Sequence, residues 1–138
     1  MEEKPVRKGG FEPIPEEVEA AARVAIDCAF KVHTFLGPGV LESIYERCLI
    51  YEIRKAGHEC EGQVATPLVY DGHEVGEAFY VDILVDGCLI LELKTVEKIL
   101  PVHEAQLLSY LRLTDRRLGL LINFKTDRLK HGIRRLVL

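Results

Sequence analysis

Tyr80-Val-Asp-Ile-Leu-Val-Asp-Gly-Cys-Leu-Ile-Leu-Glu-Leu-Lys94 is a stretch that predicts two β-strands joined by a tight turn at Asp86-Gly87. Asp82, Glu92 and Lys94 lie in this most apolar part of the chain, where an unpaired charge is costly to bury. Two carboxylates that hold a hard cation, with a lysine beside them, would explain why these charges are present. We therefore expect a metal site on this hairpin.

The length of the turn decides whether the three charged side chains share a face of the sheet. Side chains alternate along a strand, so Glu92 and Lys94 lie on one face. A two-residue turn would place Asp82 on the opposite face. A three-residue loop over residues 85–87, with its glycine in the left-handed bulge position, pairs Asp82 with Ile90. We expect this bulged hairpin, in which Asp82 lies diagonal to Glu92.

Length and composition favour one globular domain. The chain has 138 residues with 48% hydrophobic and 29% charged residues, which are ordinary globular values. We expect a flexible lead-in over residues 1–14 and a single domain over residues 15–138. No apolar run is long enough to span a bilayer, and the first residues lack the apolar core of a signal peptide. These features predict a cytoplasmic protein that does not associate with a membrane.

The four cysteines and the charge distribution give two further hints. The cysteines stand at positions 28, 48, 60 and 88 without a Cys-x-x-Cys pair, which indicates reduced core residues, with metal ligation a minor alternative. Residues 1–93 carry 18 acidic and 8 basic residues, whereas residues 94–138 carry 4 acidic and 10 basic ones. The basic part could meet phosphates, although a solvated helix face and tail is the simpler interpretation.

Two helices are predicted before the strands. The first begins at Pro15 with glutamates in its first turn and ends at the Gly37-Pro38-Gly39 turn. The second is predicted from about residue 40 to residue 56 and carries Glu42 one turn before Tyr45. The Glu42 carboxylate can therefore project along the edge of the buried face. A surface glutamate in the first turn of a helix is the plainer alternative.

The remaining segments predict a mixed sheet. A meander of three antiparallel strands should cover residues 63–94, and a third helix residues 102–113. Gln106 and Tyr110 share one face of that helix, where they could line a groove or simply face solvent. The apolar run 118–124 predicts a strand that returns parallel to its neighbour through a right-handed crossover. The tail should form a loop and a short charged edge strand or helix.

The order of these motifs resembles the PD-(D/E)XK nuclease superfamily. Asp82 in the second strand and Glu92-x-Lys94 in the third have the positions of its motif, with Val81 where the name has proline. Gly39-Val-Leu-Glu42-Ser-Ile-Tyr45 resembles the signature of the GxxExxY proteins, and Gln106-Leu-Leu-Ser-Tyr110 resembles the Gln-x-x-x-Tyr motif of the exonuclease-like branch. The resemblance implies a restriction-endonuclease-like core with a mixed sheet of four to five strands flanked by helices.

The resemblance also implies an activity and a set of site residues. It implies a metal-dependent nuclease that hydrolyses phosphodiester bonds of nucleic acid by attack of a water that the metal activates, with DNA as the expected substrate. The implied metal is Mg²⁺, with Mn²⁺ as a possible substitute. The implied residues are Asp82, Glu92, the Leu93 backbone carbonyl and Glu42 as metal ligands, Lys94 as a further catalytic residue, and Gln106 and Tyr110 as substrate-binding residues.

Several alternatives remain open at this level. The same fold could serve as a catalytically silent module that binds nucleic acid or protein, or as a hydrolase of small phosphoesters. Because one small domain can contact few phosphates, a homodimer or a protein partner is plausible. Flanking phosphates could be contacted by a set of basic residues for which a plain surface role is the leading alternative: Lys98, His103, Arg112, Arg116 and Arg117.

Overall fold

The protein is an α/β structure, described here by a computed structural model over residues 12–138. Within this range the chain forms three α-helices and the strands of a single sheet, which confirms the predicted fold class. The elements in chain order are α1 (Glu16–Leu36), α2 (Glu42–Lys55), β1 (Cys60–Tyr70), β2 (His73–Val85), β3 (Leu89–Lys94), α3 (Pro101–Leu113), β4 (Leu118–Asn123), the 3-10 helix η2 (Leu129–Gly132) and β5 (Ile133–Val137).

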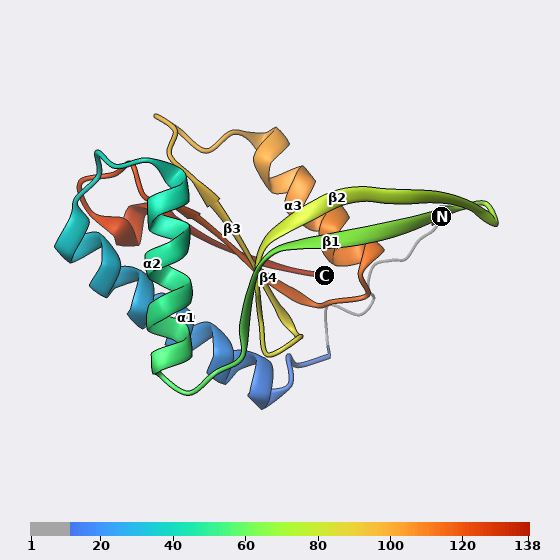
Figure 1. Cartoon of the computed structure of the whole chain (residues 1–138), viewed down its shortest axis with the longest axis horizontal. Coiled ribbons are helices and arrows are strands. Elements are labelled where there is room, and N and C mark those ends of the chain that lie inside the picture. Colours follow the sequence, from blue (N-terminus) through green and yellow to red (C-terminus); the bar gives the residue numbers. More distant parts are fainter. Residues whose placement is uncertain (1–11) are drawn as a thin grey trace.

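The five strands form one mixed sheet in the order β1-β2-β3-β4-β5 (Figure 1). β3 and β4 are parallel, and the other neighbours are antiparallel. A parallel pair needs a crossover connection, which α3 provides between β3 and β4. The predicted three-strand meander and the parallel return strand are therefore confirmed, and the tail forms both η2 and the edge strand β5. This topology is consistent with a restriction-endonuclease-like core.

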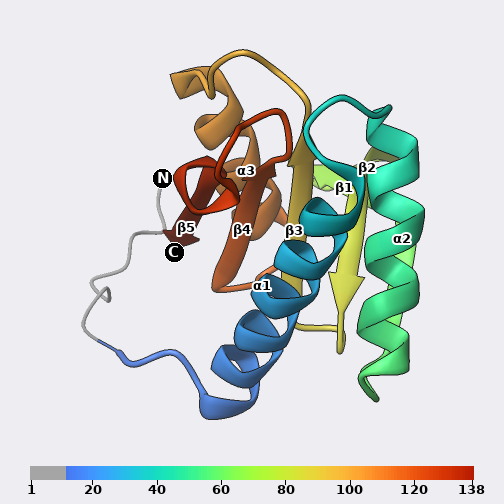
Figure 2. The ribbon, with the colours of Figure 1, turned by 90° about the vertical axis from the view of Figure 1, so that its left-hand side faces the viewer.

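Helices cover both faces of the sheet (Figure 2). α1 and α2 lie on one face, where Leu91 of β3 belongs to their common core. The neighbouring residue Ile90 points to the other face and packs with Leu107 and Leu111 of α3. Since side chains alternate along β3, Glu92 points to the same side as Ile90. The Glu92 side chain therefore lies on the side of the sheet that α3 covers.

Helix α1 follows the predicted pattern. It begins after Pro15 with three glutamates in its first turn, which is favourable at the positive end of the helix dipole. Ala21, Ala25 and Ala29 are fully buried against the core. Their small side chains allow the helix axis to approach the sheet closely. The helix ends at Gly37, whose φ of 74° is a conformation that glycine adopts readily.

Helix α2 begins two residues later than predicted. Leu41 is its N-cap and has an extended backbone, so the first helical residue is Glu42. The Tyr45 hydroxyl donates a hydrogen bond to the Gly37 carbonyl and accepts one from the N–H of Val40 at 3.2 Å. These bonds hold the α1–α2 turn in a non-helical shape. The expected start at residue 40 was therefore wrong, because the tyrosine binds the turn in place of a further helical turn.

The β2–β3 hairpin has a three-residue loop in a different register from the predicted one. Val85 pairs with Leu89, so the loop is residues 86–88 and not residues 85–87. The first two loop residues both have positive φ, 53° at Asp86 and 67° at Gly87. The predicted bulged hairpin has only one left-handed residue, the glycine. An aspartate also adopts this conformation at low cost, and it moves the loop by one residue.

The corrected register changes the partner of Asp82. Ile83 pairs with Leu91, which places Asp82 across from Glu92. The predicted pairing of Asp82 with Ile90, and the diagonal relation to Glu92, were therefore wrong. The expectation that both carboxylates share a face of the sheet is confirmed, and they lie closer together than predicted because directly opposite residues are nearest neighbours across a sheet.

β1 and β2 extend beyond the rest of the sheet as a two-stranded arm (Figure 1). The ladder is irregular at Thr66/Pro67 and at Leu68/Val69, and the strands turn at Asp71-Gly72. Tyr70 near the tip is 71% exposed. Neither strand contains a lysine or an arginine, so the arm carries only acidic charges: Glu61, Asp71, Glu74, Glu77 and Asp82.

Three expectations from composition concern the whole chain. No helix within residues 12–138 is long and apolar enough to cross a bilayer. All four cysteines are free, as expected, and Cys28 and Cys60 are buried. The lead-in predicted for residues 1–14 falls mostly outside the described residues. Of its last residues, Glu12 and Pro13 accept hydrogen bonds from Arg117 through their carbonyl oxygens, at 3.0 and 3.2 Å.

Candidate active site

Asp82 and Glu92 interlock across β2 and β3. Oε2 of Glu92 accepts a hydrogen bond from the N–H of Asp82 at 3.0 Å, and Oδ2 of Asp82 accepts one from the N–H of Leu93 at 2.9 Å. The bonds lie just beyond the last regular pair of the ladder, Ile83 with Leu91. Each carboxylate therefore replaces a strand-to-strand bond, and its orientation is fixed by the backbone of the opposite strand.

Glu92 is a buried carboxyl group that forms no ion pair within the described part of the chain. It is 4% exposed, and among residues 12–138 no cationic side chain lies within ion-pair distance. Burial, followed by the nearby charge of Asp82, raises the pKa of Glu92 to about 8. The group therefore holds a proton at neutral pH unless a cation comes to lie beside it.

Lys94 and Glu42 complete a group of four charged side chains. Lys94 ends β3 and is half-buried, and Glu42 is the first residue of α2. Burial and the charge of Asp82 raise the pKa of Glu42, whereas Lys94 opposes the rise. The effect of one charge on another weakens with the distance between them and with screening by solvent, so groups that shift each other's pKa lie near one another. The structure thus brings together all four residues that the sequence singled out, from three different elements.

Glu46 and Gln63 also lie at the site, and the sequence did not single them out. Nε2 of Gln63 donates a hydrogen bond to Oε1 of Glu46 at 2.9 Å and a longer one to Oδ1 of Asp82 at 3.4 Å. Burial raises the pKa of Glu46, and its hydrogen bond with Gln63 opposes the rise. One signal was present: Glu46 follows Glu42 by one helical turn, so both glutamates lie on one face of α2.

Gln63 has an unusual backbone conformation inside β1. Its φ is 50°, a left-handed value that costs a residue with a side chain on the order of 1 kcal/mol. The preceding Gly62 allows α2 to approach closely, because a Cβ there would lie 2.7 Å from Cδ1 of Ile50 and 3.3 Å from Oε2 of Glu46. Nothing in the local sequence predicts a left-handed glutamine within a strand.

Tyr110 and Gln106 of α3 differ in their surroundings. The Tyr110 ring stacks on Phe79 of β2, with centroids 4.1 Å apart and an angle of 2° between the planes. Burial and the charges of Glu92 and Asp82 raise the pKa of Tyr110, so its ring lies close to the acidic pair. Gln106 is exposed one turn earlier on the same helix. The structure therefore brings Tyr110 to the site and leaves Gln106 at its solvent side.

Most of the basic residues that could contact flanking phosphates make hydrogen bonds within the protein. Arg116 donates to the carbonyl of Gly87, and Arg117 donates to the carbonyl of Leu138 as well as to the lead-in. Nδ1 of His103 accepts the N–H of Leu100 at the start of α3. Arg112 donates to Oγ of Ser109 at 3.3 Å, so four of the five have a partner among the described residues and Lys98 has none.

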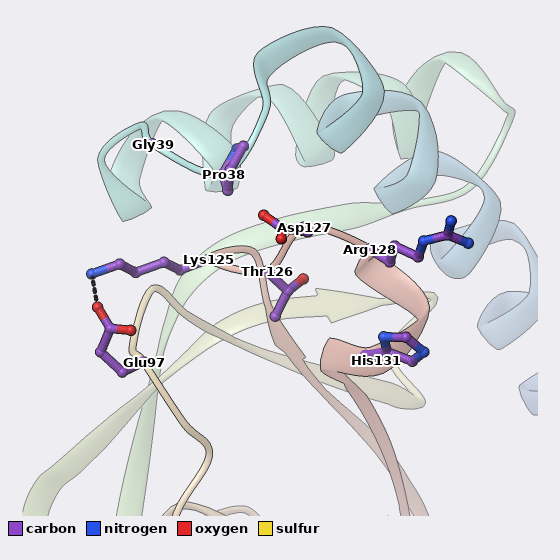
Figure 3. Close-up of a pocket in the computed structure, with 8 residues that line it drawn as sticks. All are labelled: Pro38, Gly39, Glu97, Lys125, Thr126, Asp127, Arg128 and His131. Carbon is purple, nitrogen blue, oxygen red and sulfur yellow. Dashed lines mark ion pairs between the residues drawn. The ribbon is translucent and has the colours of Figure 1, made fainter.

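A pocket lies where the chain leaves the carboxyl ends of β3 and β4 (Figure 3). The pocket is open and has a volume of about 770 Å³. Nζ of Lys125 pairs with Oε2 of Glu97 at 2.8 Å on one side of it. Its lining residues come from the α1–α2 turn, the segment after β3 and the segment after β4: Pro38, Gly39, Glu97, Lys125, Thr126, Asp127, Arg128 and His131.

Buried side chains hold the walls of this pocket. Asn123 is 2% exposed, and its Oδ1 accepts the N–H groups of Val96 at 3.1 Å and Lys125 at 3.2 Å. Since Asn123 pairs with Lys94 in the sheet, these bonds tie the pocket to the end of β3. The ring of Tyr45 stacks on Phe124, the residue before the pocket-lining Lys125, with centroids 4.4 Å apart. The pocket and the acidic group therefore share one rigid frame.

The donor set of the acidic group suits a hard divalent cation. Oxygen ligands from carboxylates are what Mg²⁺ and Mn²⁺ prefer, and Glu92 is buried with no ion-pair partner among residues 12–138. Among residues 12–138, however, no group of three or more His, Cys, Asp or Glu side chains is arranged as a metal site. A cation would therefore need oxygen from the backbone or from water besides Asp82 and Glu92, as Mg²⁺ commonly takes.

The comparison with known protein families gives one match. A family model described as the PD-(D/E)XK nuclease superfamily matches residues 19–136, which include every residue of the acidic group. Neither the curated proteins nor the solved structures contain a match to the chain.

Proposed function

Because the chain belongs to the PD-(D/E)XK nuclease superfamily, we propose that it hydrolyses phosphodiester bonds of nucleic acid at the acidic group. One observation supports this proposal above the others. Asp82 and Glu92 face each other with fixed orientations, and Lys94 lies on the same side of β3. A pair of oriented carboxylates beside a lysine is suited to bind a cation and to stabilise charge on a phosphate.

We infer that Asp82 and Glu92 hold Mg²⁺ directly, together with the Leu93 carbonyl and water, and that Glu42 from the start of α2 supports the cation through one of these waters; Mn²⁺ would be a substitute. A bound divalent cation would neutralise charge on the phosphate and lower the pKa of a water molecule. The protein contributes the orientation of the two carboxylates, which their hydrogen bonds to backbone N–H groups fix before any ligand arrives.

Lys94 has the role of a positive group beside the reacting phosphate. Its ammonium lies near enough to Glu42 and Glu92 to lower the pKa of both. From that position it can orient the attacking water and stabilise the negative charge that develops on the phosphate oxygens. Its loss should therefore lower the rate of cleavage more than the affinity for nucleic acid.

The strand of nucleic acid is proposed to run along the same end of the sheet. Tyr110, which stacks on Phe79, and the exposed Gln106 would contact it near the acidic group. The pocket would receive the next part of the strand, where Arg128 and His131 are exposed and have no ion pair with a described residue. We propose DNA as the substrate.

We also propose that the protein belongs to the GxxExxY branch of the superfamily. The three residues of that signature have separate places in the structure. Gly39 lines the pocket, Glu42 lies at the acidic group, and Tyr45 fixes the turn between them. A signature in which each residue has a role in or next to the site supports the assignment more than spacing alone.

The test is cleavage of a panel of single-stranded, duplex and branched DNA and RNA with Mg²⁺ or Mn²⁺. The native protein is compared with Glu92→Ala, with Lys94→Ala and with Lys55→Ala as a matched control, since Lys55 is exposed at the far end of α2. We expect cation-dependent cleavage that is lost in the first two variants and kept in the control. Binding without cleavage under every condition would contradict the proposal and indicate a silent binding module.

A further inference from the structure

We propose that Gln63, anchored by Glu46, is a positioning residue that holds the Asp82 carboxylate in the orientation in which it binds the divalent cation. This inference rests on the proposed function, because it gives Gln63 and Glu46 a role in the same site. It adds two residues from α2 and β1, and neither belongs to the motif that defines the acidic group.

Hydrogen bonds on both oxygens fix the Asp82 carboxylate. Oδ2 accepts the N–H of Leu93 at 2.9 Å, and Oδ1 accepts Nε2 of Gln63 at 3.4 Å. The first bond comes from the rigid backbone of β3, so it sets the position of one oxygen. The second sets the rotation of the carboxylate about its last bond. Without Gln63, Oδ1 would have no protein donor among the described residues and could turn away.

Glu46 fixes the Gln63 amide in turn. Oε1 of Glu46 accepts Nε2 of Gln63 at 2.9 Å, the shorter of the two bonds that the amide makes. Ionised carboxylates only accept hydrogen bonds, so the amide nitrogen, and not its oxygen, must face Glu46 and Asp82. The assignment of the amide is therefore set by its two neighbours. A chain of bonds now joins α2, β1 and β2.

The backbone of β1 is shaped to place this amide. The left-handed φ of 50° at Gln63 interrupts the regular alternation of the strand, and such conformations persist only where the surroundings stabilise them. The bond to Glu46 provides that stabilisation. Close packing of α2 over Gly62 brings the glutamate within reach, since a Cβ at Gly62 would lie 3.3 Å from Oε2 of Glu46. The left-handed backbone at Gln63 and the close packing at Gly62 therefore both favour the hydrogen bond between Gln63 and Glu46.

An amide suits this position better than a charged side chain would. It supplies two N–H groups to two carboxylates and adds no positive charge. A lysine or arginine would neutralise the carboxylates and compete with the cation. A purely structural bridge between α2 and β1 has no such requirement. The chemistry of Gln63 thus agrees with a site that must keep its negative charge available.

Four variants separate positioning from a structural role: Gln63→Gly, Gln63→Asn, Glu46→Gln and Glu46→Ala, with the exposed Glu61→Ala as a control on the same strand. Each is measured by titration calorimetry with Mg²⁺ and Mn²⁺ and by urea unfolding without a cation. Glycine and asparagine both tolerate a left-handed φ, so neither disturbs the backbone, but asparagine is one methylene too short to bridge.

We expect Gln63→Gly, Gln63→Asn and Glu46→Ala to weaken cation affinity about 10-fold or more, the range typical when a residue that orients a metal ligand is lost. Glu46→Gln should keep near-native affinity, because its amide oxygen still accepts the bond from Gln63. Unfolding of Gln63→Gly should stay close to native, since relief of the strained φ offsets the lost hydrogen bonds.

Three results would overturn the inference. The first is native cation affinity in Gln63→Gly and Gln63→Asn, which would leave the nuclease proposal standing if the native protein still cuts. The second is loss of affinity in Glu46→Gln as large as in Glu46→Ala, which would make Glu46 itself a ligand. The third is no cation uptake by the native protein. Weakened affinity in the variants of a protein that never cuts would support the inference and contradict the proposed function.

Discussion

The N–H of Asp82 donates a hydrogen bond to Oε2 of Glu92 at 3.0 Å, so the second acid of the site is attached to the backbone of the first. The side chain of Asp82 makes the reciprocal contact with the N–H of Leu93. A change at either acid therefore alters the support of the other. A variant that tests the charge of one acid should therefore keep the shape of its carboxyl group, so that the hydrogen bond to the other strand can remain. Glu92→Gln is for this reason more informative than Glu92→Ala.

Glu92→Gln should stabilise the cation-free protein at high pH. The pKa of Glu92 is about 8 in the folded protein against an ordinary value of 4.5, so the folded state binds the extra proton between these values. The stability of the native protein therefore falls as pH rises from about 4.5 to about 8. Urea unfolding at pH 9 should show the variant more stable by roughly 2–4 kcal/mol, with little difference at pH 4.

Glu61→Gln on exposed β1 is the matched control for this pH dependence. It should change the free energy of unfolding little at either pH. Addition of Mg²⁺ should reduce the difference between the native protein and Glu92→Gln, because a cation stabilises the ionised carboxylate. If the free energy of unfolding had the same pH dependence in the native protein and in Glu92→Gln, the pKa of Glu92 would not be raised by folding.

Lys94→Met should separate cation binding from cleavage. The ammonium of Lys94 lies close to the carboxylates, so its removal takes away a repulsion toward the cation and should tighten Mg²⁺ binding roughly five-fold. Cleavage should fall by about 10²-fold or more, as is usual when a positioned charged group is removed from a reacting centre. Calorimetry and an oligonucleotide assay measure the two effects. Weaker cation binding would contradict this assignment.

Tyr45→Phe should lower stability through the α1–α2 turn. The hydroxyl bonds to the Gly37 carbonyl and to the N–H of Val40 would be lost, while the stacked ring on Phe124 would remain. We expect a loss of about 1–2 kcal/mol in the free energy of unfolding. Tyr51→Phe is the control, since that residue is 62% exposed. Equal stability of both variants would exclude a role for the hydroxyl in holding the turn.

Arg128→Ala should weaken nucleic-acid binding without a cation present. Arg128 is exposed at the pocket, and the loss of one phosphate contact should reduce the salt dependence, d log K/d log[salt], by about 0.7–0.9. Fluorescence anisotropy with labelled duplex and single-stranded oligonucleotides measures this slope in EDTA. Lys55→Ala at the far end of α2 is the control and should leave the slope unchanged. Equal slopes would place the strand elsewhere.

The helices and strands could be predicted because each follows from a local pattern. Alanines at helical spacing gave α1, and the continuous apolar run gave the parallel strand β4. The register of the β2–β3 hairpin could not be predicted, because it depends on whether Asp86 adopts a left-handed conformation. Glycine does so freely, whereas aspartate does so only in a suitable loop. The turn was therefore located correctly at Asp86-Gly87, but the loop begins one residue later than predicted, so each cross-strand partner is shifted by two residues.

The site was predictable only in its charged members. Asp82, Glu92 and Lys94 stand out because ionisable residues are rare among apolar ones, and that signal is visible in a single sequence. Gln63 and Asn123 are neutral, and their importance depends on contacts with residues far away in the chain. Such contacts exist only after the sheet has formed. Residues that support the site in this way cannot be recognised from spacing.

The arm formed by β1 and β2 makes the charge distribution of the molecule asymmetric along its long axis. Its exposed tip carries Asp71, Glu74 and Glu77, whereas Lys125 and Arg128 lie on the segment after β4, at the other end of the long axis (Figure 1). A polyanion that reaches the site from either side meets repulsion at one end and attraction at the other. The field of the protein therefore favours contacts between a polyanion and the end of the molecule that carries the basic segment, and disfavours contacts with the tip of the arm.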